Sequence, residues 1–153
     1  MNKIADLLPA ANIVVDLPAD TKARLFDAMG GLFERTAGLS AAMVTTSLAA
    51  RERLGSTGLG QGIAIPHGRI KGLASATAAF ARLRAPIPFD APDGRPVAQV
   101  FVLLVPEQAT EAHLQLLSEL AQMFSERTFR EQLATAADAA ELERLFAAWQ
   151  PVA

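Results

Sequence analysis

The stretch "QVFVLLV", residues 99–105, constrains the fold more than any other part of the chain. After Gln99 it is wholly apolar and rich in valine, and a proline follows it directly. A run of this length and composition is typical of a strand in the middle of a sheet that is covered on both faces. We therefore expect a central strand here, with helices packed on the sheet to which it belongs.

The first third of the chain has the pattern of one strand followed by two helices. Residues 12–17, "NIVVDL", form a short β-branched run closed by a proline, which predicts a strand and a turn. Apolar residues then recur at helical spacing over 21–36, and Asp20 is a candidate cap for that helix. Ser40 is the candidate cap of a second helix, which we expect to end near Leu54.

The middle of the chain predicts further strands. "GIAI" (62–65) has the length of a short buried strand, and "ATAAFARLR" (76–84) that of a longer one. Between the longer strand and the apolar run, residues 85–97 carry four prolines, which predicts a connection with turns.

The last third of the chain predicts three helices. Residues 110–125 carry an apolar stripe that begins at His113. Thr128 and Asp138 are each followed three residues later by a glutamate, a capping-box spacing that predicts the starts of a short helix and a final one. The order of strand, two helices, several strands and three helices predicts a single-domain α/β/α sandwich with a mixed β-sheet flanked by helices.

Length and composition limit the classes of function. The 153 residues suit one domain over 1–153, which can bury a core without metals or disulfides. The formal net charge of −2 argues against nucleic acid as a partner. Cysteine is absent, so disulfides and cysteine-based zinc sites are excluded. We recognise neither a signal peptide nor the roughly 18 to 20 apolar residues of a membrane span, so we expect a cytoplasmic protein without membrane insertion.

The segment "RERLGSTGLGQGIAIPHGRI", residues 51–70, carries five glycines and one of the two histidines of the chain. It lacks the Lys–Ser/Thr pair of a Walker A loop and the GxGxxG spacing of a dinucleotide-binding loop. Ser56 does not lie in a G-x-S-x-G nucleophile elbow, and two histidines without a third ligand are too few for zinc. We therefore expect no cofactor and no metal.

His67 is the best candidate for a reactive residue in this segment. A neutral imidazole is a nucleophile near pH 7, and its phosphorylated form carries roughly two negative charges that need nearby donors. Arg51, at the end of the second helix, and the amides of the glycine loop could supply them. Pro66 restricts the backbone before the histidine and would hold it steady. This combination favours phosphoryl transfer.

Each of these residues also has a purely structural interpretation. A histidine in a Pro-His-Gly turn is often structural, and His113 on an apolar stripe can be a partly buried histidine bonded to a backbone group. Arg51 fits the last turn of any helix, where the dipole favours a cation. Ser56 and Thr57 can close a turn through side-chain bonds to the backbone.

The segment from Arg51 to Gly68, REx(2)GSTGxGxGIAIPHG, resembles the phosphorylation-site signature of enzyme IIA proteins of the phosphoenolpyruvate-dependent phosphotransferase system, in the fructose/mannitol/nitrogen superfamily. Gln61 stands where such signatures commonly have Asn. Residues 85–107 and 113–124 resemble later segments of the family in order and spacing, so the likeness covers nearly the whole chain. The variant is most similar to the nitrogen-regulatory type.

The resemblance implies a set of roles for the site residues. His67 would receive a phosphoryl group on Nε2 from an HPr-type phosphocarrier protein. His113 would donate a hydrogen bond to that group, and Arg51 would stabilise its charge. The supporting residues of the signature are Ser56, Thr57, Gly58, Gly60, Gly62, Pro66 and Gly68.

The resemblance leaves more than one function open. A nitrogen-type protein would regulate partners by its phosphorylation state, with potassium transport proteins or sensor kinases as candidate targets. A sugar-transport enzyme IIA would instead pass the phosphoryl group to a separate IIB protein. A non-reactive anion-binding module is the alternative outside the family. Leu59 and Ile63 beside the loop are candidates for an apolar patch on which a carrier docks.

Overall fold

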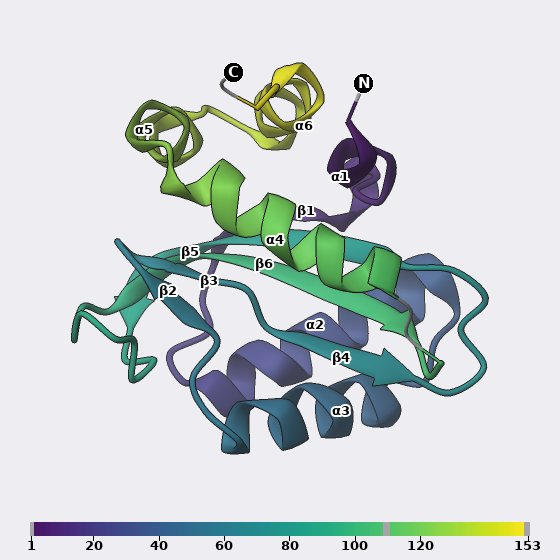
Figure 1. Ribbon diagram of the computed structural model, residues 1–153. Coiled ribbons are helices and arrows are strands. Elements are labelled where there is room, and N and C mark those ends of the chain that lie inside the picture. Colours follow the sequence, from purple (N-terminus) through teal and green to yellow (C-terminus); the bar gives the residue numbers. More distant parts are fainter. Residues whose placement is uncertain (1, 109–110, 152–153) are drawn as a thin grey trace.

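The computed structural model describes residues 2–108 and 111–151, and it has three layers, with a mixed sheet between two layers of helices (Figure 1). This confirms the predicted α/β/α sandwich. Helices α2 and α3 lie on one face of the sheet, and α4 crosses the other face with α1, α5 and α6 on the same side. The elements are, in chain order, α1 (Lys3–Asp6), a 3₁₀ turn (Ala10–Asn12), β1 (Ile13–Leu17), α2 (Lys22–Ala37), α3 (Ala41–Arg53), β2 (Gly58–Gly60), β3 (Ile63–Ala64), β4 (His67–Ile70), β5 (Thr77–Ile87), β6 (Val97–Pro106), α4 (Glu111–Ser125), α5 (Arg127–Thr135) and α6 (Ala139–Ala148).

Strand β6 is the centre of the six-stranded sheet, as the apolar run predicts. On one side it pairs antiparallel with β5, with Phe80 opposite Phe101. On its other side it pairs parallel with both β3 and β4, which follow one another along the same edge. Two residues separate β3 from β4, and His67, the first residue of β4, pairs with Leu103 of the central strand. The remaining pairs are β1 with β5, parallel, and β2 with β3, antiparallel.

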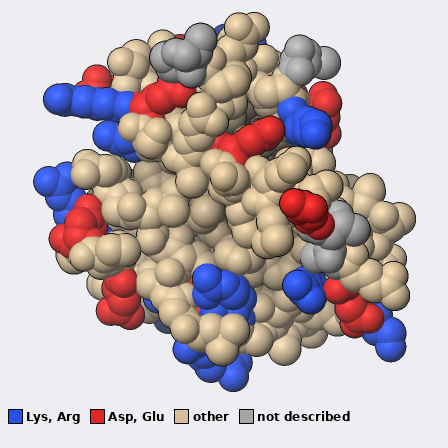
Figure 2. Space-filling view, viewed as in Figure 1, with Lys and Arg blue, Asp and Glu red and all other residues tan. Residues whose placement is uncertain are grey.

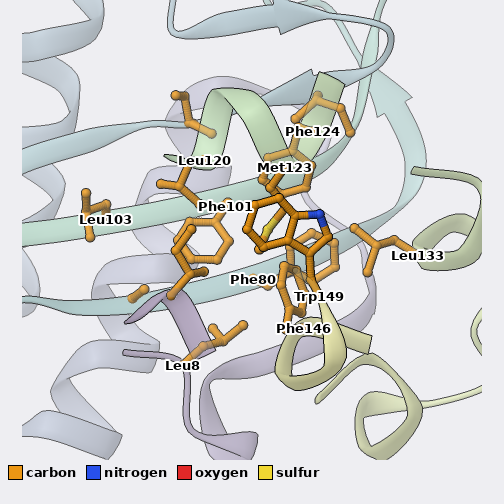
Figure 3. Close-up of a cluster of buried hydrophobic side chains, with 14 of the residues drawn as sticks. Leu8, Phe80, Phe101, Leu103, Leu120, Met123, Phe124, Leu133, Phe146 and Trp149 are labelled. Carbon is orange, nitrogen blue, oxygen red and sulfur yellow. The ribbon is translucent and has the colours of Figure 1, made fainter. Parts of the chain in front are cut away.

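The alternation of side chains along β5 and β6 divides the core into two halves. Phe101 and Leu103 pack under α4 and the C-terminal helices, whereas Val100 and Val102 pack against α2 and α3. In the first half, Phe146 lies among the other aromatic rings at the centre of a cluster (Figure 3). Each half is buried between the sheet and one of the two helical layers.

The caps of α2 and α3 differ in how well the sequence predicts them. Ser40 caps α3 as expected, since its Oγ accepts a hydrogen bond from the Met43 amide. The prediction that Asp20 caps α2 is wrong. Thr21 holds that position, with its hydroxyl accepting from the Arg24 amide, and Asp20 forms an exposed ion pair with the Arg24 side chain instead. Both residue types are good caps, so a one-residue difference in the helix start decides between them.

Strand β5 extends beyond its predicted end. The proline-rich segment 85–97 was expected to be a connection throughout, but β5 continues to Ile87 and includes Pro86. The pairing with β6 is irregular between Arg82 and Ile87, so the missing amide hydrogen of the proline falls where the ladder is already broken.

The two predicted capping boxes near the C-terminus have different outcomes. The box at Thr128 is wrong, because α5 begins at Arg127, only two residues after α4 ends, and the capping residue Glu126 makes no side-chain cap bond. The start at Asp138 is confirmed: its carboxylate accepts from the Glu141 amide at 2.9 Å. Glu141 in turn accepts from the amide of Ala137, one residue before the position a capping box requires. The predicted start of α4 at residue 110 lies outside the described residues.

No helix in the described part of the chain is long and apolar enough to cross a membrane.

Candidate functional site

A cavity of about 430 Å³ opens between α3, β4 and α4. It brings together three residues that the sequence singles out: Arg51 and His67 of the signature, and His113 from a distant part of the chain. Figure 2 shows that the face between α4 and α3 is largely uncharged, with basic side chains over α3. The remaining lining residues are Ser47, Ala50, Leu54, Gly68, Arg69, Leu103, Val105, Leu114 and Leu117.

His67 is the first residue of β4, and its ring is fixed by its own backbone. Its Nδ1 lies 2.9 Å from the carbonyl oxygen of Ile65. A carbonyl can only accept, so Nδ1 carries the proton and the neutral ring has its lone pair on Nε2. The residue before His67 is also held, because the Pro66 carbonyl accepts a hydrogen bond from the Leu103 amide of β6 at 3.0 Å. The ring nitrogen that keeps its lone pair is therefore defined by the local fold.

The environment of His67 favours the neutral ring. Partial burial is the main cause that lowers the pKa of His67 below its ordinary 6.5, and the nearby Arg51 cation lowers it further. The bond to the Ile65 carbonyl and the carboxylate of Glu52 oppose this shift without cancelling it. At pH 7 the ring is mainly unprotonated, which is the form that can attack phosphorus.

Arg51 lies in the last turn of α3, on the cavity wall. Its guanidinium donates from one terminal nitrogen to the carbonyl oxygen of Gly55 at 2.8 Å, which closes the helix end. A guanidinium has five N–H donors, so this bond leaves others for an anion in the cavity. The structural and the functional interpretation of this arginine are therefore compatible.

His113 is the third residue of α4 and is half-buried in the opposite wall. Its neighbours Leu114 and Leu117 line the same cavity. The first turn of a helix directs amide hydrogens and a positive partial charge toward its start, which favours an anion nearby. His113 is thus placed at a polar point on an otherwise apolar wall.

The glycine loop shapes the backbone rather than lining the cavity. Gly60, Gln61 and Gly62 all have positive φ, at +90°, +58° and +80°, and make the tight turn between β2 and β3. Gly58 passes so close to Ala91 that an added Cβ would lie 2.8 Å from the alanine methyl group. Of the glycines in the signature, only Gly68 lines the cavity, where β4 approaches α3.

The hydroxyl residues before the loop act within turns. The Ser56 hydroxyl accepts from the Gly58 amide at 3.1 Å and donates to the Phe89 carbonyl at 2.6 Å. Thr57 is buried, and its hydroxyl donates to Glu52 at 2.6 Å. Ser56, Thr57 and Pro66 do not line the cavity. The turn-closing interpretation is confirmed for Ser56.

Sequence reasoning assigned no role to Glu52, which follows Arg51 in the signature. Its carboxylate is 6% exposed and forms an ion pair with Lys22, with Nζ and Oε2 2.9 Å apart. It also accepts from both the amide and the hydroxyl of Thr57. The only signal in the sequence was its position beside the arginine, because Lys22 lies 30 residues away.

The exposed apolar side chains near the cavity are not those expected. Ile63 is only 1% exposed and belongs to the core, and Leu59 does not line the cavity. Leu54 and Leu114 do line it, and they are 85% and 65% exposed. The predicted patch is therefore wrong for Ile63, whereas Leu59 is exposed on the loop but outside the cavity, and Leu54 and Leu114 are the exposed leucines of the cavity itself.

Within residues 2–108 and 111–151, no three His, Cys, Asp or Glu side chains are grouped so that they could hold a metal ion.

Comparisons with known proteins agree with the fold and the signature. The family model described as "Phosphoenolpyruvate-dependent sugar phosphotransferase system, EIIA 2" matches residues 6–149. A nitrogen regulatory protein of Pseudomonas aeruginosa is 41% identical over 146 residues, which cover 95% of each chain. A fructose-specific EIIA component of Haloferax volcanii is 36% identical over 124 residues, 81% of this chain and 71% of that protein. The crystal structure of nitrogen regulatory protein IIA-Ntr from Neisseria meningitidis superposes with a TM-score of 0.89 at 52% identity, over 94% of this chain and 99% of that one. The resemblance noted in the sequence is thereby confirmed: the chain belongs to the EIIA 2 family of the phosphoenolpyruvate-dependent phosphotransferase system, whose members are phosphoryl-transfer components.

Proposed function

We propose that this protein is a nitrogen-type regulatory enzyme IIA that carries a phosphoryl group on Nε2 of His67. The observation that carries the proposal is the 2.9 Å bond between Nδ1 and the Ile65 carbonyl, which leaves the lone pair on Nε2 in a ring that lines the cavity with Arg51 and His113. The nitrogen-type assignment is supported by the likeness to the Pseudomonas and Neisseria proteins.

The reaction is a transfer between two histidines. The donor is an HPr-type phosphocarrier whose phosphohistidine meets His67 at the cavity. The Nε2 lone pair attacks phosphorus, a new Nε2–P bond forms, and the N–P bond of the donor breaks with its electron pair left on the donor imidazole. His67 has no proton on Nε2 to lose, because its proton is on Nδ1. No metal or nucleotide takes part in this step.

Arg51 and His113 stabilise the charge that arrives. The guanidinium fork matches phosphate oxygens, and its single positive charge offsets part of the negative charge of the phosphoryl group. His113 donates a ring N–H to a phosphoryl oxygen from the opposite wall. Both act in a partly apolar cavity, where electrostatic interactions are stronger than in water.

The mouth of the cavity is the docking surface for the carrier. Leu54 and Leu114 give it an apolar margin, which is expected of a small transient interface. The same surface serves to regulate partners, because phosphorylation of His67 changes its charge. Potassium transport proteins and sensor kinases remain the candidate partners.

The test is phosphorylation by phosphoenolpyruvate, enzyme I and an HPr-type carrier. We expect the wild-type protein to gain one acid-labile phosphoryl group, and His67→Ala to gain none, since the nucleophile is lost. Intact-mass measurement with and without acid treatment shows both. Labelling of His67→Ala equal to that of the wild type would contradict the site, and binding of phosphate without labelling of the wild type would favour the anion-binding module.

The sugar-transport alternative is supported by the likeness to the fructose-specific component of Haloferax volcanii. It predicts that a separate IIB protein removes the phosphoryl group from His67. Loss of the label to a fructose- or mannitol-type IIB at a rate comparable with its gain from the carrier would favour this alternative.

A further inference from the structure

An ionic cluster is centred on Glu52, close enough to His67 to affect its pKa, and the proposed reaction does not use it. Its centre is Glu52, in the last turn of α3, with a carboxylate only 6% exposed. Oε2 accepts from Lys22 Nζ at 2.9 Å and from the Thr57 amide at 3.1 Å, and Oε1 accepts from the Thr57 hydroxyl at 2.6 Å. We call the set Lys22, Glu52 and Thr57 the clasp.

The clasp joins segments that are separate in the chain. Lys22 is the first residue of α2, Glu52 is the next-to-last residue of α3, and Thr57 precedes β2. Lys22 Nζ also lies 4.6 Å from the centre of the Phe89 ring, so the loop after β5 is held at the same point. Lys22 Nζ also lies 3.7 Å from the exposed carboxylate of Asp90. The amide and the hydroxyl of Thr57 would lose their acceptor if the Glu52 carboxylate moved, so this buried carboxylate is a rigid anchor for Thr57.

Two hydrogen bonds connect the clasp to the histidine. The carbonyl of Thr57 accepts from the Ile65 amide at 3.0 Å. The carbonyl of Ile65 accepts from His67 Nδ1 at 2.9 Å. The clasp therefore fixes the backbone of Thr57, Thr57 fixes Ile65, and Ile65 selects the nitrogen of His67 that holds the proton.

We infer that Glu52 is a positioning residue for phosphoryl transfer, acting through Thr57 and the Ile65 carbonyl to hold His67 in the tautomer with a free Nε2. The inference rests on the proposed role of His67. It assigns the glutamate beside Arg51 a task different from that of the arginine: the arginine faces the phosphoryl group, whereas the glutamate faces away from the cavity and orients the nucleophile. Glu52 is not among the cavity-lining residues, as this division requires.

The experiment follows the tautomer and the transfer rate in the same set of variants. Glu52→Gln removes the charge that holds Lys22, and Thr57→Val removes the hydroxyl from the clasp. Thr57→Ser keeps the hydroxyl. Glu131→Gln replaces the glutamate of an exposed ion pair on α5 in the same way and serves as the matched control for Glu52→Gln.

We expect nitrogen-15 NMR of the histidine rings, assigned by the loss of signals in His67→Ala, to show the Nδ1–H tautomer in the wild type. Glu52→Gln and Thr57→Val should show a mixture of tautomers at His67. Their rate constant of transfer from the phosphorylated carrier should fall about tenfold with an unchanged KM, because orientation is lost while the docking surface is intact. Thr57→Ser and Glu131→Gln should behave as the wild type does.

The inference is overturned if folded Glu52→Gln and Thr57→Val retain the wild-type tautomer, whatever their transfer rate. It is also overturned if the tautomer changes without a change in rate. Should Glu52→Gln fail to fold, the Thr57→Val and Thr57→Ser pair decides the question alone. Should the wild type accept no phosphoryl group, the proposed function fails, but the tautomers of the unphosphorylated variants still show whether the clasp orients His67.

Discussion

At the scale of single residues, His67 shows how burial and charge set the form of a side chain. Its pKa lies below 6.5, chiefly because partial burial disfavours the imidazolium. As the pH falls through 6.5, the unfolded chain therefore takes up a proton at this residue before the folded protein does. Protonation of His67 therefore lowers the free energy of unfolding as the pH falls, and this loss begins near pH 6.5 and is complete below the pKa of His67 in the folded protein. The same shift keeps the nucleophile unprotonated at pH 7.

We predict that Arg51→Met raises the pKa of His67, because a neighbouring cation is removed from the imidazolium. NMR titration of the His67 ring measures it. Arg53→Met is the matched control, since Arg53 lies in the same last turn of α3 but does not line the cavity. Equal shifts in the two variants would contradict a specific role of Arg51 beside the histidine.

At the scale of elements, the sequence predicts those whose signal is local. The valine-rich run of β6 and the Ser40 cap of α3 need no information from elsewhere in the chain, and both are where the pattern predicts them. The sequence does not predict strands β2 and β4, because both are short and β2 consists of glycine and leucine alone. Their strand character comes from pairing with β3 and β6.

The residues of the site likewise differ in whether a local sequence signal predicts their role. Arg51 and His67 belong to one continuous signature, so their proximity follows from a short segment of chain. Glu52 belongs to it too, but its role depends on Lys22 in another helix and cannot be inferred from spacing. The Gly68 requirement is likewise non-local: an added Cβ would lie 3.1 Å from Ser47 Cβ and closer still to the Ser47 hydroxyl, where α3 crosses β4.

One contact between elements yields a test of how the C-terminal helices are held. The Arg82 guanidinium on β5 donates to the carbonyls of Leu133 and Ala136 at the end of α5, at 3.0 and 2.7 Å. We predict that Arg82→Met lowers the free energy of unfolding by about 2 kcal/mol, because these carbonyls lose a charged donor. Urea unfolding followed by circular dichroism measures the loss.

Arg84→Met, two residues along the same strand, is the control for this change. Arg84 forms only an exposed ion pair with Asp16 at 3.3 Å, so we expect a loss of no more than about 0.5 kcal/mol. A loss for Arg82→Met as small as that for Arg84→Met would show that the carbonyl contacts do not hold α5 on the sheet.

At the scale of the whole molecule, the two halves of the core meet only through the sheet. Strands β5 and β6 send alternate side chains into both halves, so neither helical layer has a folded surface to pack on unless the sheet is formed. The cavity beside His67 uses both layers, with Arg51 from α3 on one side and His113 from α4 on the other. Its geometry therefore requires that the layers fold together, and this coupling can be measured.

We predict that a mutation in one layer lowers the stability of the other by the same amount. Phe33 belongs to α2 and is fully buried, so Phe33→Leu should cost about 1 to 3 kcal/mol. Trp149, the only tryptophan of the chain, packs in the opposite half of the core, so its fluorescence reports on that layer alone. In urea, the fluorescence midpoint should fall together with the midpoint from far-ultraviolet circular dichroism, because a single cooperative unit has one transition. If the fluorescence transition stays at its wild-type midpoint while the circular dichroism shifts, the layers unfold separately and the cavity loses its shape before the C-terminal half of the core is lost.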